Sequence, residues 1–366
     1  MTARIGVIGT GWWATRAHLP AIAANPEAEL VAIADPDEAN RSRAAEVFGP
    51  PATYGDHRDM LRAERLDGVV VAVPHTRHFE IARDALQAGL HVLVEKPMVL
   101  RSDHARELLS TAAERGREII VGYPWHYNEQ ADRARDWIAS GAIGDLLYVH
   151  SLFASIVWEL YRGDVELVAG EMGYTVNPTG RDTYSDPALS GGGQGVTQIT
   201  HSGALLLHMT GLEPAEVFAL MHNHDLRVDL VCALSVRFEG GCLGAVGSTG
   251  STVRTQEEVL EYRLYGTGGH ILFDVMNEQL VMYRADGSIT ESPPCPPAPA
   301  GRDYSTSYPE EGPLDNLVEV IGGGTNRSPG RLGARVVAML EAAYASAAEG
   351  RPRPVAPTDP PQAADR

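Results

Sequence analysis

One basic residue stands apart in this chain of 366 residues. Lysine and arginine together number 30, and Lys96 is the only lysine among them. A lysine amine can lose its proton when it is buried, whereas an arginine keeps its charge and presents a bulkier planar group. Lys96 is therefore a candidate for proton transfer or for stabilising a developing negative charge. The alternative is the chance survival of one lysine.

A glycine-rich turn near the start of the chain predicts a phosphate site. Residues 9–14 (Gly9, Thr10, Gly11, Trp12, Trp13, Ala14) match G-x-G-x-x-(G/A), follow an apolar run and open a stretch with helical periodicity. In this pattern the first glycine permits a tight turn, the second admits a pyrophosphate, and the alanine keeps helix and strand close. Free N–H groups at the helix start bind phosphates. Together these features predict dinucleotide binding, with an ordinary glycine turn as the alternative.

An acidic residue follows the second apolar run of the chain. Asp35 ends the run 29–34. Its carboxylate would accept hydrogen bonds from ribose hydroxyls and repel a 2′-phosphate, which favours NAD over NADP. Arg41 and Arg43, a few residues on, would soften that preference.

Later apolar runs end in further candidates for the cofactor site. Pro74 and His78 follow one run, and Glu95 and Lys96 follow the next. Ligands of open α/β sheets bind beyond the carboxyl ends of the strands, so these residues are predicted to face the cofactor. Packing or capping of a helix is an equal alternative for His78.

The elements that must hold these residues follow from the apolar pattern. Valine- and isoleucine-rich runs alternate with helical periods as far as residue 122, which is typical of a parallel sheet with helices on both faces. The expected strands are 4–9, 29–34, 67–73, 91–94 and 118–121, and the expected helices are 14–24, 40–48, 78–88 and 102–115.

The pattern changes after residue 122 and favours an α+β domain with an open, mostly antiparallel sheet. The expected strands are 146–155, 230–238, 241–248 and 259–266 with a hairpin over 271–283, and the expected helices are 131–140, 195–209 and 332–349. Residues 161–190 lack a clear period, 292–309 read as a proline-rich surface loop, and the tail after residue 352 should fray. We expect an α/β protein with a Rossmann domain over 1–123 and a second domain over 124–366, its closing helix packing back on the first.

Composition excludes several classes of function. A net charge of −18 argues against nucleic acid and anionic membranes as partners, and no apolar run approaches the length of a membrane span. Three cysteines without metal or redox spacing, and no signal-peptide pattern at the start, indicate a reducing, cytoplasmic setting. No histidine or cysteine cluster predicts a metal site.

Four segments in order resemble one enzyme family. They are the G-x-G-x-x-A turn, V-P-x-x-x-H at 73–78, AGLHVLVEKPM at 88–98 and GGGQGVTQITH at 191–201. The chain resembles the glucose-fructose oxidoreductase / inositol dehydrogenase (Gfo/Idh/MocA) family over nearly its whole length. The resemblance implies an NAD(P)-dependent oxidoreductase that forms homodimers or homotetramers through its second sheet. It also implies that Lys96, the lysine of the EKP motif, lies by the nicotinamide and the reacting hydroxyl.

The resemblance places a second catalytic position on the helix after the glycines. Family members often carry an aspartate and a histidine four residues apart there. His201 matches the histidine, but Thr197 replaces the aspartate. Both lie on one helical face, yet threonine cannot raise the pKa of the histidine as an aspartate would. His201 is the second catalytic candidate, with Gln198 and Tyr127 as candidate helpers.

Aromatic residues predict a sugar site between the domains, because their faces and polar tips suit sugar rings. The candidates are Tyr123, Trp125, His126, Tyr127, Trp158, Tyr161, Tyr174 and Tyr184, with Asp182, Asp186, Thr197 and Gln198 for hydroxyl groups. Many relatives carry an arginine where His126 stands, so a strongly anionic substrate is disfavoured. Core packing or surface exposure is the alternative for each of these residues.

The combined prediction is hydride transfer between NAD and a secondary hydroxyl of a sugar, glycoside or polyol, with ring carbon 3 of a glycoside as the specific expectation. A redox-neutral glycoside-processing enzyme that retains NAD is one alternative, to which Thr200 and His201 give weak similarity. The other is a non-catalytic NAD-binding sensor, which the missing aspartate favours and the presence of Lys96 and His201 disfavours.

Overall fold

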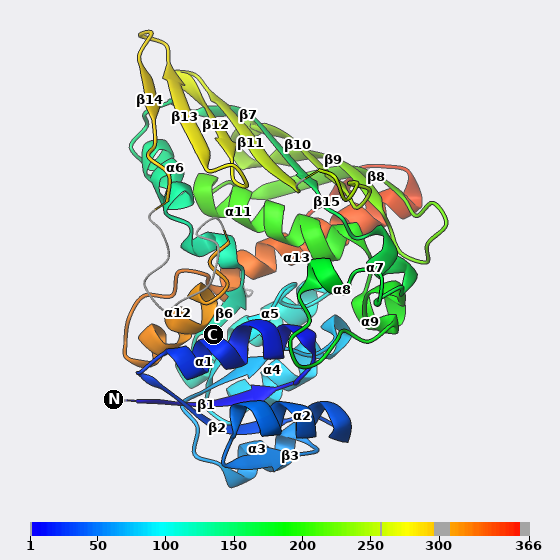
Figure 1. The fold of residues 1–366 in the computed structure, drawn as a ribbon. Helices are drawn as coiled ribbons and strands as arrows, with labels where there is room; N and C mark the ends of the chain where they lie inside the picture. The colour runs from blue at the N-terminus through cyan, green and yellow to red at the C-terminus, as the bar shows by residue number, and fades with distance from the viewer. Residues whose placement is uncertain (1, 257, 296–307, 359–366) are drawn as a thin grey trace, which may run out of the picture.

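Two β-sheets with helices between them make up the protein. The computed structural model describes residues 2–256, 258–295 and 308–358. The first sheet lies at the bottom of Figure 1 and the second at the top, with α11 (Thr200–Thr210) and α13 (Gly330–Glu349) between them. The two predicted kinds of sheet are therefore confirmed, and the space between them is where side chains from both can meet.

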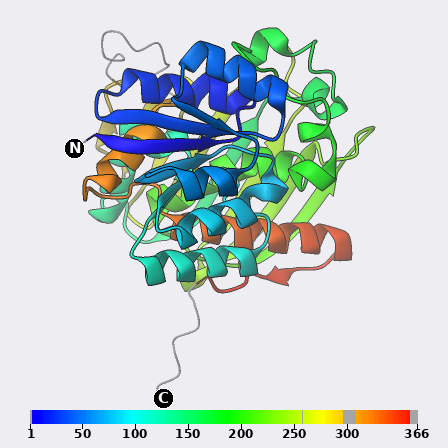
Figure 2. The same cartoon turned by 90° about the horizontal axis from the view of Figure 1, so that it is seen from below.

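The first sheet is parallel, with strand order β3-β2-β1-β4-β5-β6. Its strands are β1 (Ala3–Ile8), β2 (Ala28–Ala34), β3 (Ala52–Tyr54), β4 (Gly68–Val71), β5 (His91–Glu95) and β6 (Ile119–Gly122). The helices α1 (Leu19–Ala24), α2 (Glu38–Phe48), α3 (His57–Ala63), α4 (His78–Gln87) and α5 (Ser102–Arg115) cover both faces (Figure 2). The order reverses between β1 and β4, and sheets of this kind bind ligands at that point.

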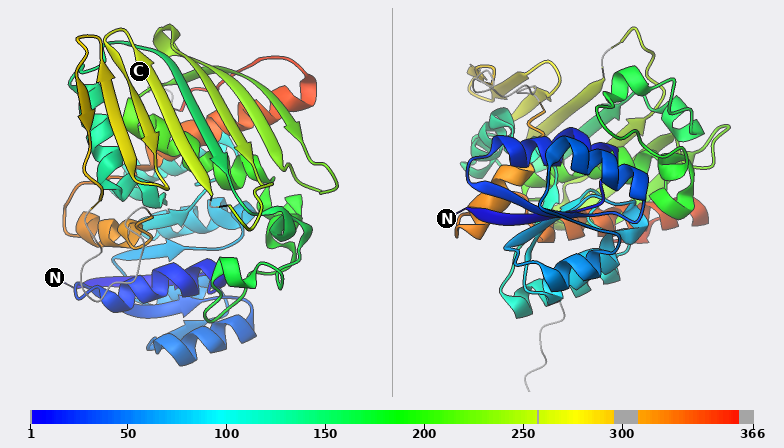
Figure 3. Two further views of the ribbon diagram at one scale, coloured as in Figure 1. Left: turned by 45° about the horizontal axis from the view of Figure 1, so that its top comes forward. Right: turned by 60° about the horizontal axis from the view of Figure 1, so that its bottom comes forward.

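The second sheet is mostly antiparallel, with order β14-β13-β12-β11-β7-β10-β9-β8-β15 and one parallel pair, β7 with β10. Its strands are β7 (Leu146–Ala154), β8 (Pro214–His222), β9 (Val231–Phe238), β10 (Leu243–Thr249), β11 (Val259–Gly266), β12 (Gly269–Asp274), β13 (Gln279–Arg284), β14 (Ile289–Glu291) and β15 (Arg353–Pro354). Helices α6 (Glu129–Ala139), α11 and α13 lie on one face, and no helix of the described residues covers the other face, which the left view of Figure 3 shows.

Short elements connect the sheets. A segment beside the first sheet holds α7 (Trp158–Arg162), α8 (Ala169–Met172), α9 (Asp182–Ser185) and α10 (Pro187–Ser190). Helix α12 (Gly312–Ile321) packs on β5 and β6, and α13 packs on α5, β6 and β8. A Cβ on Gly333 of α13 would lie 2.8 Å from Val121, so this glycine allows α13 to approach the first sheet. None of the helices within the described ranges is long and apolar enough to cross a membrane.

Some sequence expectations need correction. The tail after residue 352 does not simply fray, because Arg353 and Pro354 pair with Val217 and Glu216 at the edge of β8. Strand β8 was not predicted, since its alanine, glutamate, leucine and methionine residues have little preference for strands. Elements β3, α3 and α12 were also missed. Residues 296–307 of the predicted proline-rich loop lie outside the described residues.

Both helices that carry site motifs begin with a wide turn. The stretch predicted as helix 14–24 starts with a π-helical turn, Ala14–His18, before α1. The stretch predicted as 195–209 starts with another, Gly195–Ile199, before α11. Single π-helical turns of this kind often occur at functional sites.

Candidate active site

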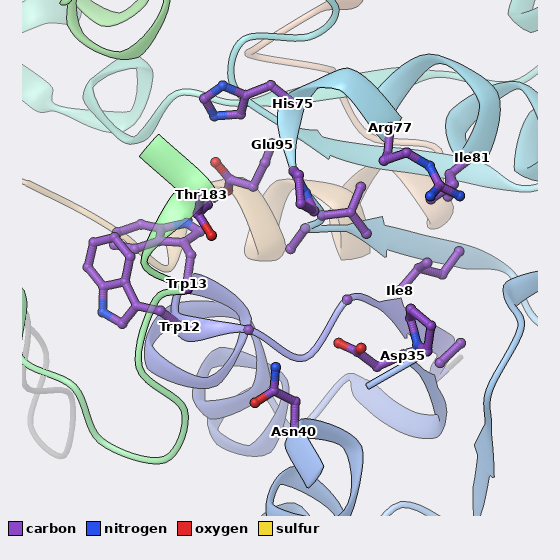
Figure 4. Close-up of a pocket in the computed structure, with 18 of the residues that line it drawn as sticks. Ile8, Trp12, Trp13, Asp35, Asn40, His75, Arg77, Ile81, Glu95 and Thr183 are labelled. Atoms are coloured by element: carbon purple, nitrogen blue, oxygen red, sulfur yellow. Dashed lines mark hydrogen bonds between the residues drawn. The ribbon is translucent and has the colours of Figure 1, made fainter. Parts of the chain in front are cut away.

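A cavity of about 520 Å³ surrounds the glycine turn at the carboxyl ends of the first sheet's strands (Figure 4). Gly9 has φ of +89°, and a Cβ there would lie 2.2 Å from the carbonyl oxygen of Ala72, so only glycine fits. A Cβ on Gly11 would meet no atom within 4 Å, which leaves its backbone open toward the cavity. An exposed backbone beside a helix start is what a pyrophosphate needs.

Asp35 ties the glycine turn to the end of β2. Its Oδ2 accepts hydrogen bonds from the backbone N–H and the hydroxyl of Thr10, at 2.7 and 2.9 Å, and its Oδ1 accepts one from the N–H of Asp37 at 2.8 Å. The side chain nevertheless lines the cavity, at the opposite end of Figure 4 from the two tryptophans. The guanidinium of Arg41 donates to the Asp35 carbonyl at 2.5 Å. The pocket therefore presents a carboxylate with an arginine close by.

A segment that precedes the second glycine-rich stretch closes over this cavity. We call residues 173–190 the strap; Pro178, Thr179, Gly180, Thr183, Tyr184 and Leu189 of the strap line the cavity. The buried Asn177 fixes the strap to the glycine turn, because its Nδ2 donates to the carbonyls of Thr10 at 2.6 Å and Asn40 at 3.0 Å. Its Oδ1 accepts from Arg43 Nε at 2.6 Å. Asn177 was not predicted from the sequence. The only indication of its role there is that it begins the turn N-P-T-G.

A second cavity of about 480 Å³ adjoins the first. The two cavities share Trp12, Trp13, Lys96 and Tyr184. Its other lining residues come from the turn before α1, the segment after β6, β7 and α7, the start of α11, the loops next to β11 and β12, and the segment before α12. They are Arg16, Trp125, Phe153, Ile156, Val157, Leu160, Tyr161, Thr197, Gln198, His201, Glu258, Met276, Tyr308 and Glu310. Lys96 therefore lies where the two cavities meet.

Lys96 follows β5, and its Nζ lies 3.4 Å from the carbonyl oxygen of Thr197. Burial lowers the pKa of Lys96, and the negative charge of Glu95 opposes that shift. The amine is thus closer to giving up its proton than an exposed lysine would be.

Glu95 is held by three donors. Its Oε1 accepts from Trp13 Nε1 at 2.9 Å and contacts His18 Nε2 at 2.8 Å, and its Oε2 accepts from the N–H of Lys96 at 3.1 Å. Burial alone would raise the pKa of Glu95, but the hydrogen bond and charge of His18 outweigh it and lower the pKa. A Cβ on Gly122 would lie 2.6 Å from Glu95 Oε1, so β6 must carry a glycine beside this carboxylate.

His201 projects from α11 into the second cavity. Its side chain packs against the edges of Trp125 and Tyr123, with ring centroids 5.2 and 6.1 Å away. Burial and the neighbouring Lys96 lower the pKa of His201 well below its usual value, so the imidazole is neutral. Its Nδ1 has no hydrogen-bond partner in the described part of the chain.

Thr197, which stands where the family aspartate would be, interacts with its own helix. Its hydroxyl donates to the carbonyl of Gly193 at 2.9 Å, and the Tyr161 hydroxyl contacts the Thr197 hydroxyl oxygen. The Thr197 hydroxyl is thus engaged by Gly193 and Tyr161, and in the described part of the chain no hydrogen bond joins it to His201.

Several predicted site residues line neither cavity. Tyr123 is buried with its hydroxyl 3.0 Å from Thr200 Oγ1, and His126 is buried against Ser328 at 2.9 Å. Tyr127 donates to Asn316 at 3.2 Å, and Trp158 donates to Asp225 at 3.1 Å. These side chains shape the surroundings of the site, and Trp125 is the one aromatic residue of the stretch 123–127 that reaches the cavity.

Other predicted residues lie behind the cavity walls or on the surface. Thr10 and Ala14 pack within the turn, and the His78 ring lies between the carbonyls of Pro97 and Val73, at 2.8 and 2.9 Å. Tyr174 packs edge-on against Trp12, 6.0 Å between centroids. Asp182 is exposed, and Asp186 caps α10. Among the residues that the structure describes, no group of histidine, cysteine, aspartate or glutamate could hold a metal ion.

A buried carboxylate that sequence reasoning missed holds the glycines before α11. Asp229 accepts from the N–H groups of Gly193 and Gly195, both at 2.7 Å, and from the Tyr344 hydroxyl at 2.7 Å. A Cβ on Gly193 would lie 2.0 Å from the Asp229 carbonyl oxygen, which explains the glycine. In the sequence Asp229 is indistinguishable from a surface acid.

Two family models match the chain. One, described as an oxidoreductase family with an NAD-binding Rossmann fold, matches residues 3–123, and a GFO/IDH/MocA C-terminal domain matches residues 154–272. The first match spans every strand of the first sheet, and the second spans β8 to β11 and the residues Thr197, Gln198 and His201 of the second cavity.

Relatives and solved structures extend the comparison. The chain is 36% identical over 150 residues to a dTDP-3,4-didehydro-2,6-dideoxy-α-D-glucose 3-reductase of Streptomyces violaceoruber, a match covering 41% of this chain and 44% of that one. It is 28% identical over 268 residues to D-xylose 1-dehydrogenase (NADP(+)) 2 of Haloferax volcanii, covering 73% of this chain and 74% of the relative.

In three dimensions a levoglucosan dehydrogenase in complex with NADH superposes with a TM-score of 0.80 at 20% identity, over 97% of this chain and all of that one. At this identity the similarity concerns the fold. Both halves of the chain match the family models and the motif residues converge at the junction of the cavities. The chain therefore belongs to the Gfo/Idh/MocA family of NAD-binding oxidoreductases.

Proposed function

We propose that the protein is a dehydrogenase that transfers a hydride between NAD and a secondary hydroxyl of a sugar, glycoside or polyol. The observation that carries this proposal is the position of Lys96 where the two cavities meet, with His201 lining the second. The open backbone at Gly11 and the carboxylate of Asp35 fit the pyrophosphate and ribose of a dinucleotide. When bound, NAD supplies the hydride acceptor.

Lys96 and His201 have different roles at the substrate oxygen: Lys96 transfers a proton, and His201 orients the oxygen. In the oxidation direction the neutral amine of Lys96 accepts the hydroxyl proton while the carbon loses a hydride, and in reduction the ammonium returns that proton. The lowered pKa of Lys96 makes the neutral form accessible. His201 stays neutral and so orients the oxygen as a hydrogen-bond partner without adding positive charge.

The walls of the second cavity support a sugar-like substrate. Trp12, Trp13, Trp125 and Tyr308 present aromatic surfaces, with Tyr308 and Trp125 4.8 Å apart between ring centroids. The Streptomyces relative is named as a 3-reductase of a deoxysugar nucleotide, so ring carbon 3 is the position we propose. The carboxylate of Asp35 favours NAD over NADP. The name of the Haloferax relative includes NADP(+), so both cofactors should be tested.

The experiment is to mix the purified protein with NAD or NADP and a panel of glucosides, inositols and aldoses, and to follow the absorbance of the reduced cofactor. We expect reduction with NAD and one sugar class. Lys96→Ala should lower kcat by roughly 10²- to 10⁴-fold while the affinity for NAD stays close to that of the wild type. Cofactor binding without reduction by any sugar, and without chemical change of the sugar, would favour the non-catalytic sensor.

A redox-neutral enzyme with retained NAD is the second candidate, and the strap favours it. Asn177 joins the strap to Thr10 of the glycine turn and to Asn40 of α2 through one hydrogen bond each, so a movement of the strap away from the cofactor cavity would break both. We expect NAD to copurify in this case, with keto sugar or cleaved glycoside forming without net reduced cofactor. Asn177→Ala should then release NAD faster in a stopped-flow measurement, whereas unchanged release would count against retention by the strap.

We also propose a cytoplasmic location and a homo-oligomeric assembly. The three cysteines are free and buried, which fits a reducing compartment. The face of the second sheet that no described helix covers supports self-association.

A further inference from the structure

One end of the substrate cavity is acidic. Glu258, just before β11, and Glu310, just before α12, both line the cavity that holds Lys96 and His201. Burial raises the pKa of Tyr308, and the negative charges of Glu95, Glu310 and Glu258 raise it further. The two carboxylates thus approach one place from different parts of the chain.

Their local partners leave part of this negative charge uncompensated. Oε1 of Glu310 pairs with Arg16 Nη2 at 3.2 Å, but its Oε2 is buried and has no hydrogen-bond partner in the structure described. Glu258 forms no ion pair within the described residues and accepts one hydrogen bond, from the N–H of Ile156 at 3.3 Å. Arg16 therefore offsets one carboxylate, and the other faces the cavity without a cation.

Burial makes this arrangement costly without a ligand. Burial raises the pKa of Glu258, and it raises the pKa of Glu310 in spite of Arg16. Partly buried carboxylates with an oxygen that lacks a partner cost free energy, and groups kept in that condition within a cleft are common at binding sites. A hydroxyl would donate one hydrogen bond and leave the charge in place, whereas an ammonium would donate several and neutralise it.

We propose that the substrate carries a protonated amine, as in an amino sugar or an aminoglycoside, and that its ammonium binds between Glu258 and Glu310 while a hydroxyl of the same molecule faces Lys96. This inference rests on the proposed function for the role of the hydroxyl, and it narrows the substrate class. The ammonium satisfies the free oxygen of Glu310 and pairs with Glu258. The aromatic walls bind the ring between these two ends.

A binding experiment tests the amine without requiring turnover. Calorimetry on the full chain with NAD compares methyl glucoside with its 2-amino and 6-amino derivatives and their N-acetylated forms, at a pH below the pKa of the amines. We expect at least one free amine to bind about 10- to 100-fold more tightly than methyl glucoside, the range of a charge-assisted hydrogen bond. N-acetylation removes the charge and should abolish the gain.

Charge-removing variants assign the effect to the two carboxylates. Glu258→Gln and Glu310→Gln should each reduce the ratio of amine to neutral-sugar affinity. Glu239→Gln removes the same charge from an exposed residue after β9 and should leave the ratio unchanged. Equal or tighter binding of methyl glucoside than of every amine, or an amine preference untouched by both cavity variants, would overturn the proposal.

Kinetics separate this inference from the proposed function. Amine preference in binding with no reduced cofactor from any sugar would refute the dehydrogenase and leave the amine site standing. Reduction of NAD by methyl glucoside with a kcat/KM as high as that for every amine would support the dehydrogenase and refute the amine site.

Discussion

At the scale of single residues, burial and a neighbouring charge shift the pKa of Lys96 in opposite directions. Burial lowers the pKa of its amine, and the adjacent carboxylate of Glu95 raises it. His201 supplies no charge, because burial and Lys96 keep it neutral. Lys96 is therefore the residue whose protonation should set the pH dependence of the reaction.

The pH profile of sugar oxidation should follow that amine. Only the unprotonated form accepts a proton, so kcat should rise as pH increases through the pKa of Lys96. Glu95→Gln removes the charge that raises this pKa, so the rise should move to lower pH. Lys96→Arg cannot lose its proton, and we expect kcat to fall roughly 10²- to 10⁴-fold with no such rise. An unchanged profile in Glu95→Gln would contradict the assignment.

Cofactor choice is also decided at a single residue. Replacing Asp35 with serine removes the carboxylate that would repel a 2′-phosphate, while Arg41 remains beside the backbone of this position. We expect the kcat/KM ratio of NADP to NAD to rise by about tenfold or more, as for the loss of one like-charge contact. Thermal unfolding serves as a control, since Asp35 also holds Thr10. A fall in both kcat/KM values with a constant ratio would show a structural role alone.

At the scale of elements, the start of α11 is positioned by a carboxylate from the loop before β9. Asp229 binds the N–H groups of Gly193 and Gly195, and this fixes where the helix directs Thr197 and His201. The glycines permit the approach, and the wide turn before α11 shifts the helix register between the glycines and His201.

Asp229→Asn should therefore weaken both the fold and the site. Its amide can accept only on one side, so one buried N–H loses its partner, at a cost of about 2 kcal/mol. We expect a lower denaturant midpoint and a lower kcat, with KM for NAD little changed because the glycine turn at residue 9 is remote from this change. Asp225→Asn, at an exposed carboxylate paired with Arg162, is the matched control and should change neither quantity. Equal effects of the two variants would disprove the anchoring role.

At the scale of the whole molecule, the second sheet presents an uncovered aromatic row. Tyr148, Tyr265, His270 and Tyr283 lie opposite one another on β7, β11, β12 and β13, with consecutive ring centroids 6.2, 5.4 and 4.8 Å apart. Leu243 on β10 adds an exposed apolar side chain. Contiguous apolar surface of this kind is typical of an interface, so we propose that two copies pack through this face.

A charged face should prevent that association. The double variant Leu243→Glu, Tyr265→Glu places two carboxylates on the row, and light scattering should then give a smaller mass than for the wild type. Leu167→Glu changes an exposed leucine away from the sheet and should leave the mass unchanged. A wild-type protein that is monomeric at micromolar concentration would refute the proposal.

The sequence by itself determined the features that depend on local pattern. The glycine turn, Asp35 and Lys96 were identified from residue type and spacing, and His201 was identified from the resemblance to the family. Gly9, Gly11, Trp12, Trp13, Asp35 and Lys96 line the first cavity, and His201 lines the second. Thr10 and Ala14 of the turn line neither cavity. The two kinds of sheet were predicted from the apolar runs, because the side chains that a strand buries recur along the sequence in a characteristic pattern. Strand β8 was not predicted, because its pairing with β9 forms it in spite of a composition that does not favour strands.

Only the tertiary structure decided which side chains share a space. Arg16, Glu258, Tyr308 and Glu310 are distant in sequence and meet in one cavity, while Tyr123, His126, Tyr127 and Trp158 lie outside it. Periodicity reports whether a residue is buried, and it does not report which residues surround it. The pKa values of Lys96 and His201 depend on those surroundings, so the chemistry of the site was fixed by packing between segments far apart in the chain.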